Sequence, residues 1–259
     1  MSEDFEVVER DQIIAVTLTR PRKYNAMSTE MLEAIRNAAL RLEQRRDLRV
    51  MLFRARGKYF SAGRDISESL TPDFQGSTLE ARAWYRQSMQ SICDIFERVE
   101  KPIVAAHQGP CLGGALELAL SCDFRLASAS ASFALPEIKL GVLPGSGGTS
   151  RLARLVGPHW ARWMVMAAQS VTAEQAVSMG LAHHLYPDEQ FEETVWNFCQ
   201  ELVALPPETV GMAKLAIELT ADLAAQQARQ VERLANSVLF IGDEHAEYIA
   251  RFKNRKRDG

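Results

Sequence analysis

Two glutamates stand beside glycine-rich segments and offer carboxyl groups for acid–base chemistry. Glu117 falls about one turn into an otherwise apolar helical segment that begins near Gly113 and Gly114. A carboxylate in an apolar face is costly to bury, so glutamates seldom lie there without a task. Glu137 follows a β-type run and precedes a glycine-rich turn. From the residues alone, Glu117 could also be a solvated or ion-paired helix residue, and Glu137 a simple turn carboxylate.

The glycines near these glutamates offer backbone amides. Gly113 and Gly114 fall at the start of a helix, where free amides and the helix dipole stabilise a negative oxygen. The segment 59–66 follows the β-type run 50–55, and its tight turn could supply a second donor. The glycine-rich turn after Glu137 lacks the Lys-Ser/Thr ending of a phosphate loop, so we interpret it as a turn that brings backbone close to a site.

Other chemistries have weaker support in the sequence. The pair His183 and His184 has no third ligand at metal spacing, and Ser146 does not lie in a nucleophile elbow. We therefore expect no metal site and no serine-hydrolase site. No step of the chemistry considered below needs a metal or a redox cofactor.

Short β-type runs alternate with helical patterns, and this alternation predicts an α/β fold with layered short strands. The expected strands are Ile13–Thr19, Val50–Ala55, Ile103–His107, Phe124–Ala127 and Ser132–Ala134.

The helical patterns differ in how clearly they begin and end. The clearest runs from Ser28, a plausible N-cap, to Arg45, and its apolar residues fall at helical spacing. The polar stretch 67–77 predicts a loop that could line a pocket and that leads into one helix over about 81–99. Thr172 begins a capping-box helix, with Gln175 as its partner and Gly180 at the C-cap.

The last part of the chain has no strand pattern. From about Pro206 onward we expect only helical segments, broken at Gly211 and Gly242. We divide the chain into a core with the active site, residues 1–200, and a helical C-terminal region, residues 201–259.

Composition limits the classes of function. The chain has 259 residues, 47% of them hydrophobic and 24% charged, and this balance is typical of a globular protein. A net charge of −3 gives no overall attraction to nucleic acid or to an anionic membrane. Four cysteines without a CxxC pair indicate free thiols in a reducing compartment. The acidic N-terminus is unlike a targeting peptide, so we expect a cytoplasmic protein without a membrane span.

Four motifs in order resemble those of the crotonase (enoyl-CoA hydratase/isomerase) superfamily over nearly the whole chain. They are R-P-R-K-Y-N-A-M at 20–27, F-S-A-G-R-D-I at 60–66, C-L-G-G-A-L-E-L-A-L-S-C-D at 111–123 and P-E-I-K-L-G-V-L-P-G-S-G-G-T at 136–149. The resemblance implies a spiral core of repeated strand-strand-helix (ββα) units with a helical C-terminal region. In the family, trimers and hexamers made of two trimers are usual.

The resemblance also implies a catalytic constellation. The backbone N–H groups of Arg64 and Gly114 match the oxyanion hole that binds the thioester oxygen. Glu117 and Glu137 match the two glutamates of the hydratase branch, and many isomerases keep only one or neither. By this resemblance Glu117 activates water, Glu137 protonates the α-carbon, and the backbone of Gly145 helps to hold the water.

Coenzyme A contacts follow from the same resemblance. Arg22 and Lys23 at the entry match phosphate contacts, and the backbone of Ala62 lies under the adenine. In the C-terminal tail, Phe252 and Arg255 match a clamp that often comes from a neighbouring subunit. The basic residues of this tail could equally be cations at a helix C-terminus. The family often has a small residue at position 64, so the side chain of Arg64 could reach toward CoA or toward an acyl group.

The resulting expectation is an enoyl-CoA hydratase, a lyase that adds water reversibly and syn to a 2-trans-enoyl-CoA. It has no cofactor beyond the CoA of its substrate, and it forms a homotrimer or homohexamer. The alternatives are an enoyl-CoA isomerase, a dehydratase of a specialised CoA ester, and a non-catalytic RNA-binding homologue. Fatty-acid metabolism, amino-acid breakdown and aromatic degradation all use this chemistry, so the sequence names neither pathway nor acyl chain length.

Overall fold

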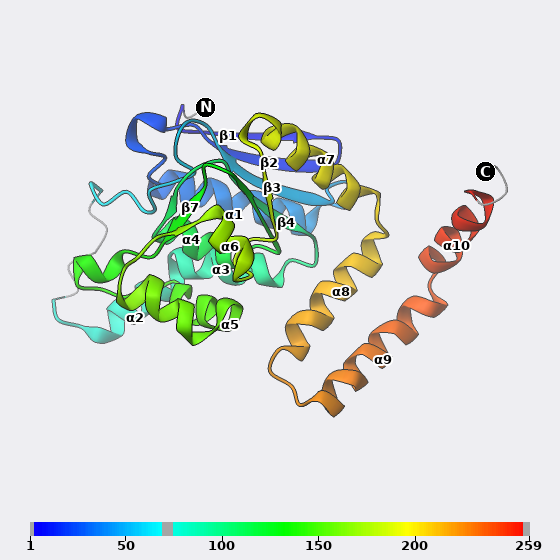
Figure 1. Ribbon diagram of the computed structural model, residues 1–259. Coiled ribbons are helices and arrows are strands. Elements are labelled where there is room, and N and C mark those ends of the chain that lie inside the picture. The colour runs from blue at the N-terminus through cyan, green and yellow to red at the C-terminus, as the bar shows by residue number, and fades with distance from the viewer. Residues whose placement is uncertain (1–2, 69–74, 256–259) are drawn as a thin grey trace.

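A six-stranded sheet forms the centre of the molecule in the computed structural model, which describes residues 3–68 and 75–255 (Figure 1). Its strand order is β1-β2-β3-β4-β6-β9; only β1 and β2 pair antiparallel, and the other neighbours are parallel. The strands are β1 Phe5–Arg10, β2 Ile13–Leu18, β3 Val50–Ala55, β4 Ile103–His107, β6 Phe124–Ser128 and β9 His184–Tyr186. The expected strands of this sheet are confirmed, and β1 and β9 are additions.

A second, three-stranded sheet lies beside the first. It consists of β5 Cys111–Leu112, β7 Ser132–Ala134 and β8 Val171–Thr172, in the order β5-β7-β8. An isolated parallel bridge joins Ser61 to Cys111, so the loop after β3 is tied to this small sheet. The two segments that carry the predicted amide donors are therefore held against each other by backbone pairing.

The two faces of the large sheet carry separate apolar clusters, because successive residues of a strand point to opposite faces. Ile14, Val16 and Leu18 of β2 face the main core, while Ile13 and Ala15 face the opposite cluster. The four cysteines are free thiols and all are buried: Cys93, Cys111 and Cys122 belong to the main core and Cys199 to the opposite cluster.

Helix α1, Thr29–Gln44, has the predicted cap and the predicted buried face. The side chain of Ser28 accepts a hydrogen bond from the amide of Met31 at 3.2 Å. The buried face packs on the main core and consists of Met31, Leu32, Ile35, Ala38, Ala39 and Leu42.

The single helix expected over 81–99 is two helices, α2 Thr78–Gln87 and α3 Met89–Arg98, so this prediction was wrong. The chain leaves helical geometry at Ser88, where ψ is −140°. The Ser88 hydroxyl donates to the carbonyl of Tyr85 at 2.9 Å, a local bond that competes with helix continuation. The break gives the two helices different surroundings, since α3 buries five residues and α2 buries none.

The core also contains helices of different lengths and several short turns. They are α4 Gly114–Leu120, α5 Gly148–Ala161, α6 Ala173–Ser178 and α7 Phe191–Ala204, with 3-10 turns η1 Pro21–Lys23, η2 Glu137–Leu140 and η4 Asp188–Gln190 and a π-helical segment η3 Arg162–Met166. The predicted capping box of α6 is confirmed, with both bonds between Thr172 and Gln175 present.

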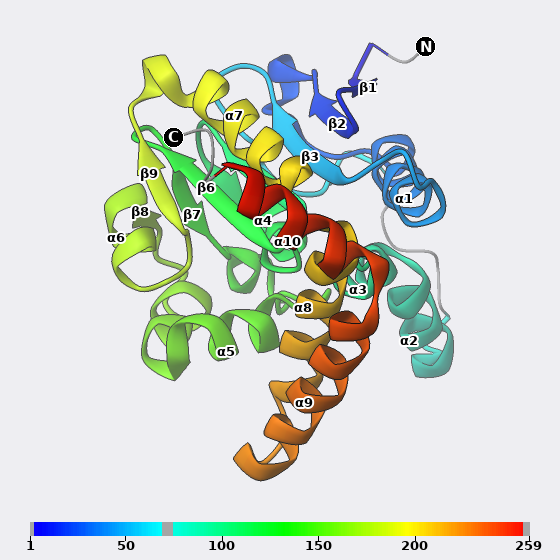
Figure 2. The same ribbon diagram turned by 90° about the vertical axis from the view of Figure 1, so that its right-hand side faces the viewer.

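Three helices form a C-terminal arm: α8 Pro207–Thr220, α9 Ala225–Ile241 and α10 Asp243–Arg255. In Figures 1 and 2, α8 and α9 form a hairpin that extends beyond the sheet. The expected break at Gly242 is confirmed, but the break at Gly211 is wrong, since Gly211 lies inside α8. A Cβ atom there would lie 2.8 Å from the carbonyl oxygen of Glu100, so this glycine allows close packing of α8 on the core.

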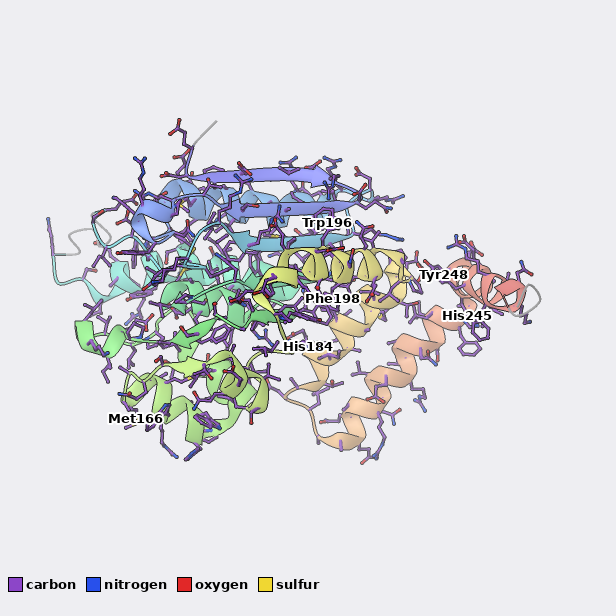
Figure 3. The ribbon with its side chains drawn as sticks, turned by 45° about the horizontal axis from the view of Figure 1, so that its top comes forward. Met166, His184, Trp196, Phe198, His245 and Tyr248 are labelled. Atoms are coloured by element: carbon purple, nitrogen blue, oxygen red, sulfur yellow. The ribbon has the colours of Figure 1, made fainter. Side chains whose placement is uncertain are left out.

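The arm is tied to the core through α8 and α10, and α9 buries none of its residues. The carboxylate of Glu244 accepts hydrogen bonds from the amides of Glu208 at 3.1 Å and Thr209 at 3.0 Å, which ties α10 to the start of α8. Tyr248 donates to the carbonyl of Ala204 at 3.4 Å, and Figure 3 shows Tyr248 on α10, far along the molecule from Met166. Exposed apolar side chains remain on α9, among them Leu234, Val238 and Ile241.

Within residues 3–68 and 75–255, no helix combines the length and the apolar character that crossing a bilayer requires.

Candidate active site

The loop that follows β3 is braced by the segment 20–27. The amide of Met27 donates to the carbonyl of Gly63 at 2.8 Å, and the amide of Asp65 donates to the carbonyl of Met27 at 2.9 Å. These are the two bonds of a parallel bridge between Met27 and Arg64, so the amide of Arg64 points away from the bracing segment. The structure thus turns this N–H toward the other side of the loop.

The amide of Gly114 lies next to that of Arg64. Gly114 is the first residue of α4, so its N–H has no partner inside the helix. A Cβ atom added to Gly114 would lie 3.6 Å from the nitrogen of Arg64, and one added to Gly63 would lie 3.1 Å from the nitrogen of Gly114. The two predicted donors therefore converge on one small region, which glycines keep open.

Glu117 is buried and firmly held. Its side chain is only 4% exposed, and its Oε1 accepts hydrogen bonds from the amides of Ser146 at 2.7 Å and Gly148 at 3.0 Å. Burial raises the pKa of this carboxyl group, while the two amides act in the opposite direction. A Cβ atom at Gly148 would lie 2.7 Å from Cγ of Glu117, so glycine is needed for this approach.

Glu137 begins η2 and reaches the same region from the other side. A Cβ atom at Gly113 would lie 3.0 Å from its Oε1. Its Oε2 is buried and has no hydrogen-bond partner within the described part of the chain. Burial raises the pKa of Glu137 to about 7, and the nearby charge of Glu117 acts in the same direction. The two glutamates are therefore coupled and differently held.

Two side chains from α2 and α3 line the region, and no pattern in the sequence pointed to either of them. Cε1 of Tyr85 lies 2.9 Å from where a Cβ atom of Gly145 would be, and Cε of Met89 lies 2.8 Å from the corresponding position at Gly114. Gly145 itself lies on the exposed turn beside Ser146. The amide of Ser146, not its hydroxyl, contacts Glu117.

The predicted CoA contacts fall into two groups. Arg22 and Lys23 lie exposed in η1, close to the loop that contains Ala62, whose amide donates to the carbonyl of Tyr24 at 2.9 Å. Phe252 lies on α10, which Figure 1 places far from α2 and α4 of the same chain. Arg255 ends α10, and its side chain lies outside the described part of the structure. The structure thus brings the entry residues to the site and leaves the tail residues away from it.

Asp65 is a further residue of this loop, one to which the sequence analysis gave no role. It is 4% exposed and forms an ion pair with Arg20 at 2.6 Å and a longer one with Lys23 at 3.4 Å. Hydrogen bonds from Ser67, followed by those of Arg20 and Lys23, keep its pKa below the usual range. Asp65 directly follows Arg64 in the motif at 60–66, and this position was the signal that could have indicated its role.

The histidine pair serves the fold. His183 Nδ1 accepts a hydrogen bond from the amide of Arg125 at 3.1 Å, and His184 stacks on Tyr186 with ring centroids 4.3 Å apart. Figure 3 shows His184 below α7, near Phe198.

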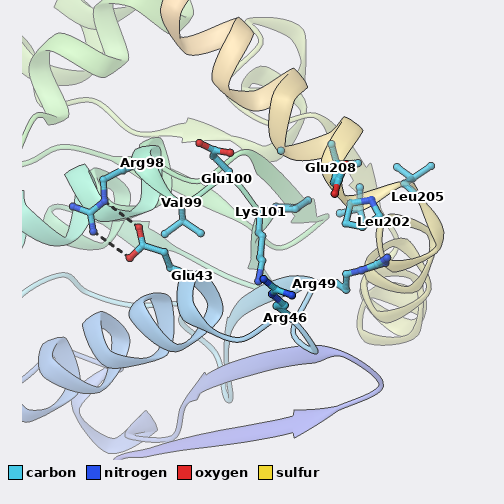
Figure 4. Close-up of a pocket in the computed structure, with 14 residues that line it drawn as sticks. Glu43, Arg46, Arg49, Arg98, Val99, Glu100, Lys101, Leu202, Leu205 and Glu208 are labelled. Carbon is cyan, nitrogen blue, oxygen red and sulfur yellow. Dashed lines mark hydrogen bonds and ion pairs between the residues drawn. The ribbon is translucent and has the colours of Figure 1, made fainter. Parts of the chain in front are cut away.

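A cavity of about 710 Å³ lies at the other end of the central strands, where β3 and β4 begin (Figure 4). Arg49 and Pro102 line it, and they directly precede β3 and β4, whereas the amide donors follow the ends of these strands. Arg98 and Glu43 form an ion pair in its wall. This cavity is therefore separate from the two glutamates.

The site of this α/β fold combines two converging amides with two coupled carboxyl groups. Such a site can stabilise a negative oxygen and transfer protons close to it. The chain matches the sequence pattern of the family described as enoyl-CoA hydratase/isomerase over residues 9–258. It therefore belongs to the enoyl-CoA hydratase/isomerase family, as its motifs predicted.

Two relatives and one solved structure illustrate the likeness. The chain is 30% identical over 251 residues to a 2,3-dehydroadipyl-CoA hydratase of Escherichia coli, covering 96% of both chains. It is 32% identical over 256 residues to a short-chain-enoyl-CoA hydratase of Clostridium acetobutylicum, covering 98% of this chain and 96% of the relative. An enoyl-CoA hydratase structure from Bacillus anthracis superposes with a TM-score of 0.89 at 28% identity, covering 97% and 96%. The predicted crotonase fold is confirmed.

Proposed function

We propose that this protein is an enoyl-CoA hydratase that adds water reversibly and syn to a 2-trans-enoyl-CoA, giving a 3-hydroxyacyl-CoA. The observation that carries the proposal is the pair Glu117 and Glu137, two coupled carboxyl groups beside the amides of Arg64 and Gly114. The hydratase relatives support the same reaction.

The two amides bind the thioester oxygen. When water adds to the β-carbon of the enoyl thioester, negative charge develops on that oxygen as an enolate. Donors fixed in advance at Arg64 and Gly114 stabilise this charge more than they stabilise the neutral ground state. The glycines around them let the thioester approach the backbone.

The two carboxyl groups move the protons. Glu117, held by the amides of Ser146 and Gly148, accepts a proton from water as the oxygen attacks the β-carbon. Glu137 donates its proton to the α-carbon when the enolate collapses, and its raised pKa keeps that proton available near neutral pH. The backbone of Gly145 helps to position the water. Transfer of a proton between the two glutamates or through solvent restores the starting state.

CoA is bound in part by this chain and in part by a neighbour. Arg22, Lys23 and the backbone of Ala62 lie near the oxyanion loop and hold the nucleotide end. Phe252 and Arg255 lie on the arm, away from the site of their own chain, which suits contacts to the CoA of a neighbouring subunit.

The C-terminal region, residues 201–259, which contains the arm, is the trimerisation region beside the core of residues 1–200, and the protein forms a homotrimer or a homohexamer of two trimers. The exposed apolar side chains of α9 support this assembly. The buried free thiols support a cytoplasmic location. No cofactor besides the CoA of the substrate takes part.

The test is the loss of the conjugated-thioester absorbance with a panel of 2-enoyl-CoA esters, from crotonyl to long-chain and aryl-substituted. Hydration of at least one ester, with formation of the 3-hydroxyacyl product, supports the proposal. If none is hydrated while 3-enoyl esters are isomerised or specialised hydroxyacyl esters are dehydrated, the hydratase assignment fails in favour of that reaction. An RNA gel shift without CoA-ester turnover would favour the RNA-binding alternative.

A further inference from the structure

Arg64 offers two different groups to the site. Its backbone amide is one of the two proposed oxyanion donors, and its side chain is only partly exposed. The guanidinium carbon lies 5.2 Å from the centroid of the Trp84 ring on α2, in a cation–π arrangement. The side chain therefore stays close to the region where the acyl group of a bound thioester would begin.

No carboxylate of the described residues forms an ion pair with this guanidinium. Nε of Arg64 is buried, and it has no hydrogen-bond partner among the described residues. Glu68 acts on it through space, but Oε2 of Glu68 already accepts from the amide of Thr29 at 3.0 Å and from its hydroxyl at 3.1 Å. A partly buried cation with an unused donor is costly, and an anionic partner would offset that cost.

A cavity of about 190 Å³ lies next to this cation. Its wall contains the apolar side chains of Leu32, Met89 and Ile92 and the ring of Trp84. Met89 links the cavity to the oxyanion amides, since its Cε lies 2.8 Å from the Cβ position of Gly114. A chain that starts at the oxyanion amides and runs past Met89 would thus enter a cavity that has both apolar side chains and a cation in its wall.

The other charged groups of this cavity are already used or solvated. Arg36 donates to the carbonyl of Gln87 at 3.0 Å and to the hydroxyl of Ser91 at 2.7 Å, so it braces the junction of α2 and α3. Glu33 lies on the exposed face of α1. The cation that remains available to a ligand in this cavity is Arg64.

We infer that the preferred substrate is a 2-enoyl-CoA whose acyl chain ends in a carboxylate, and that the Arg64 guanidinium binds this carboxylate. The inference rests on the proposed hydratase function and names its substrate class. The thioester oxygen would bind the amide of Arg64 and the distal carboxylate its side chain, so one residue sets the distance between the two ends. A chain with a few methylene groups between them fits this arrangement, because it matches the reach of one arginine side chain.

The experiment compares two esters of equal chain length, hex-2-enoyl-CoA and 5-carboxypent-2-enoyl-CoA, in wild type, Arg64→Met and Arg64→Lys. Both substitutions keep the backbone amide, so they change only the side chain. Arg86→Met is the matched control, because Arg86 lies exposed on the same helix as Trp84 and the change in charge is the same. Circular dichroism and thermal unfolding check that each variant is folded.

We expect the wild type and the control to favour the carboxylate ester by roughly 10- to 100-fold in kcat/KM, the range for a charge-assisted hydrogen bond. Arg64→Met should remove this preference, because kcat/KM for the carboxylate ester should fall further than kcat/KM for hex-2-enoyl-CoA, mainly through a higher KM for the carboxylate ester. Arg64→Lys should keep part of the preference. Equal kcat/KM for the two esters in wild type would overturn the inference, and so would an equal loss for both in Arg64→Met.

Binding separates a failure of this inference from a failure of the hydratase proposal. The saturated analogues hexanoyl-CoA and 5-carboxypentanoyl-CoA cannot be hydrated, and calorimetry measures their affinity directly. Tighter binding of the carboxylate analogue by wild type, lost in Arg64→Met, supports the inference even if no ester is turned over. Equal affinity of the two analogues rejects it whatever the catalytic result.

Discussion

Glu117 and Glu137 share one site but are held in different ways. Glu117 lies on a helix and is fixed by two amides, that of Ser146 in the turn before α5 at 2.7 Å and that of Gly148 at the start of α5 at 3.0 Å. Glu137 lies in a short 3-10 turn, and its Oε2 has no partner within the described residues. The carboxyl group of Glu117 is therefore anchored, and that of Glu137 is not.

The difference suits two roles in one reaction. An anchored carboxylate keeps a fixed direction, as a base that orients a water molecule must. An unanchored, desolvated carboxyl group with a pKa of about 7 holds a proton that it can give up and regain near neutral pH. The backbone around each glutamate, more than the residue type, therefore sets its role.

Removing either carboxyl group tests this comparison with the largest expected effect. Glu117→Gln and Glu137→Gln each remove proton transfer and keep size, so we expect kcat for hydration to fall by roughly 10²- to 10⁴-fold in either variant. Binding of a saturated acyl-CoA, measured by calorimetry, should change little. A variant that retains more than about a tenth of wild-type kcat would remove that glutamate from the chemistry.

The pH dependence tests the proton that the two glutamates share. The pKa of Glu137 is raised to about 7 and hydration needs its protonated form, so kcat/KM for hydration should fall as pH rises above about 7. The fall should approach tenfold per pH unit. In the dehydration direction Glu117 gives up a proton and Glu137 accepts one, so the reactive pair again carries a single proton, and kcat/KM for dehydration should fall over the same pH range. Profiles in both directions, in buffers of constant ionic strength, check this. A wild-type profile that stays level above pH 7 would contradict the assignment.

The glycine beside Glu117 gives a smaller and more local test. In Gly148→Ala the new methyl group would meet Cγ of Glu117 at 2.7 Å and Cβ of Pro144 at 2.9 Å. We expect kcat to fall by about tenfold because Glu117 loses its position, with less change in acyl-CoA affinity. Gly242→Ala is the control, because a Cβ atom there meets nothing closer than 3.4 Å and Gly242 lies between α9 and α10. Similar kcat values for the two variants would show that Glu117 is not held through Gly148.

Local sequence signals predicted the elements that depend on neighbours in the chain. Ser28 followed by apolar residues at helical spacing was enough for α1, and the apolar run 50–55 was enough for β3. Gly211 misled the prediction because it is a packing glycine: the carbonyl of Glu100, far away in sequence, explains it. Ser88 was missed because serine is tolerated inside helices, and only the packing of α3 shows why the chain turns there.

The residues of the site were predicted from local motifs, but the contacts that hold them were not. The motifs indicated which glutamates and amides to expect, and the structure brings Glu117, Glu137, Arg64 and Gly114 together. The bonds from Ser146 and Gly148 to Glu117 span 29 and 31 residues, so no local pattern reveals them. The cavity beside Arg64 is likewise formed by α1, α2 and α3 together, and the unusual arginine was its only signal in the sequence.

The burial of the four thiols has a practical consequence for following the opening of this fold. Burial raises the pKa of Cys93, Cys111, Cys122 and Cys199, so the reactive thiolate is scarce while the protein is folded. Cys199 lies on α7, across the sheet from the other three. A thiol reagent added to the native protein therefore labels molecules only as they open. The order in which Cys199 and the other cysteines react reports which side of the sheet exchanges with solvent first.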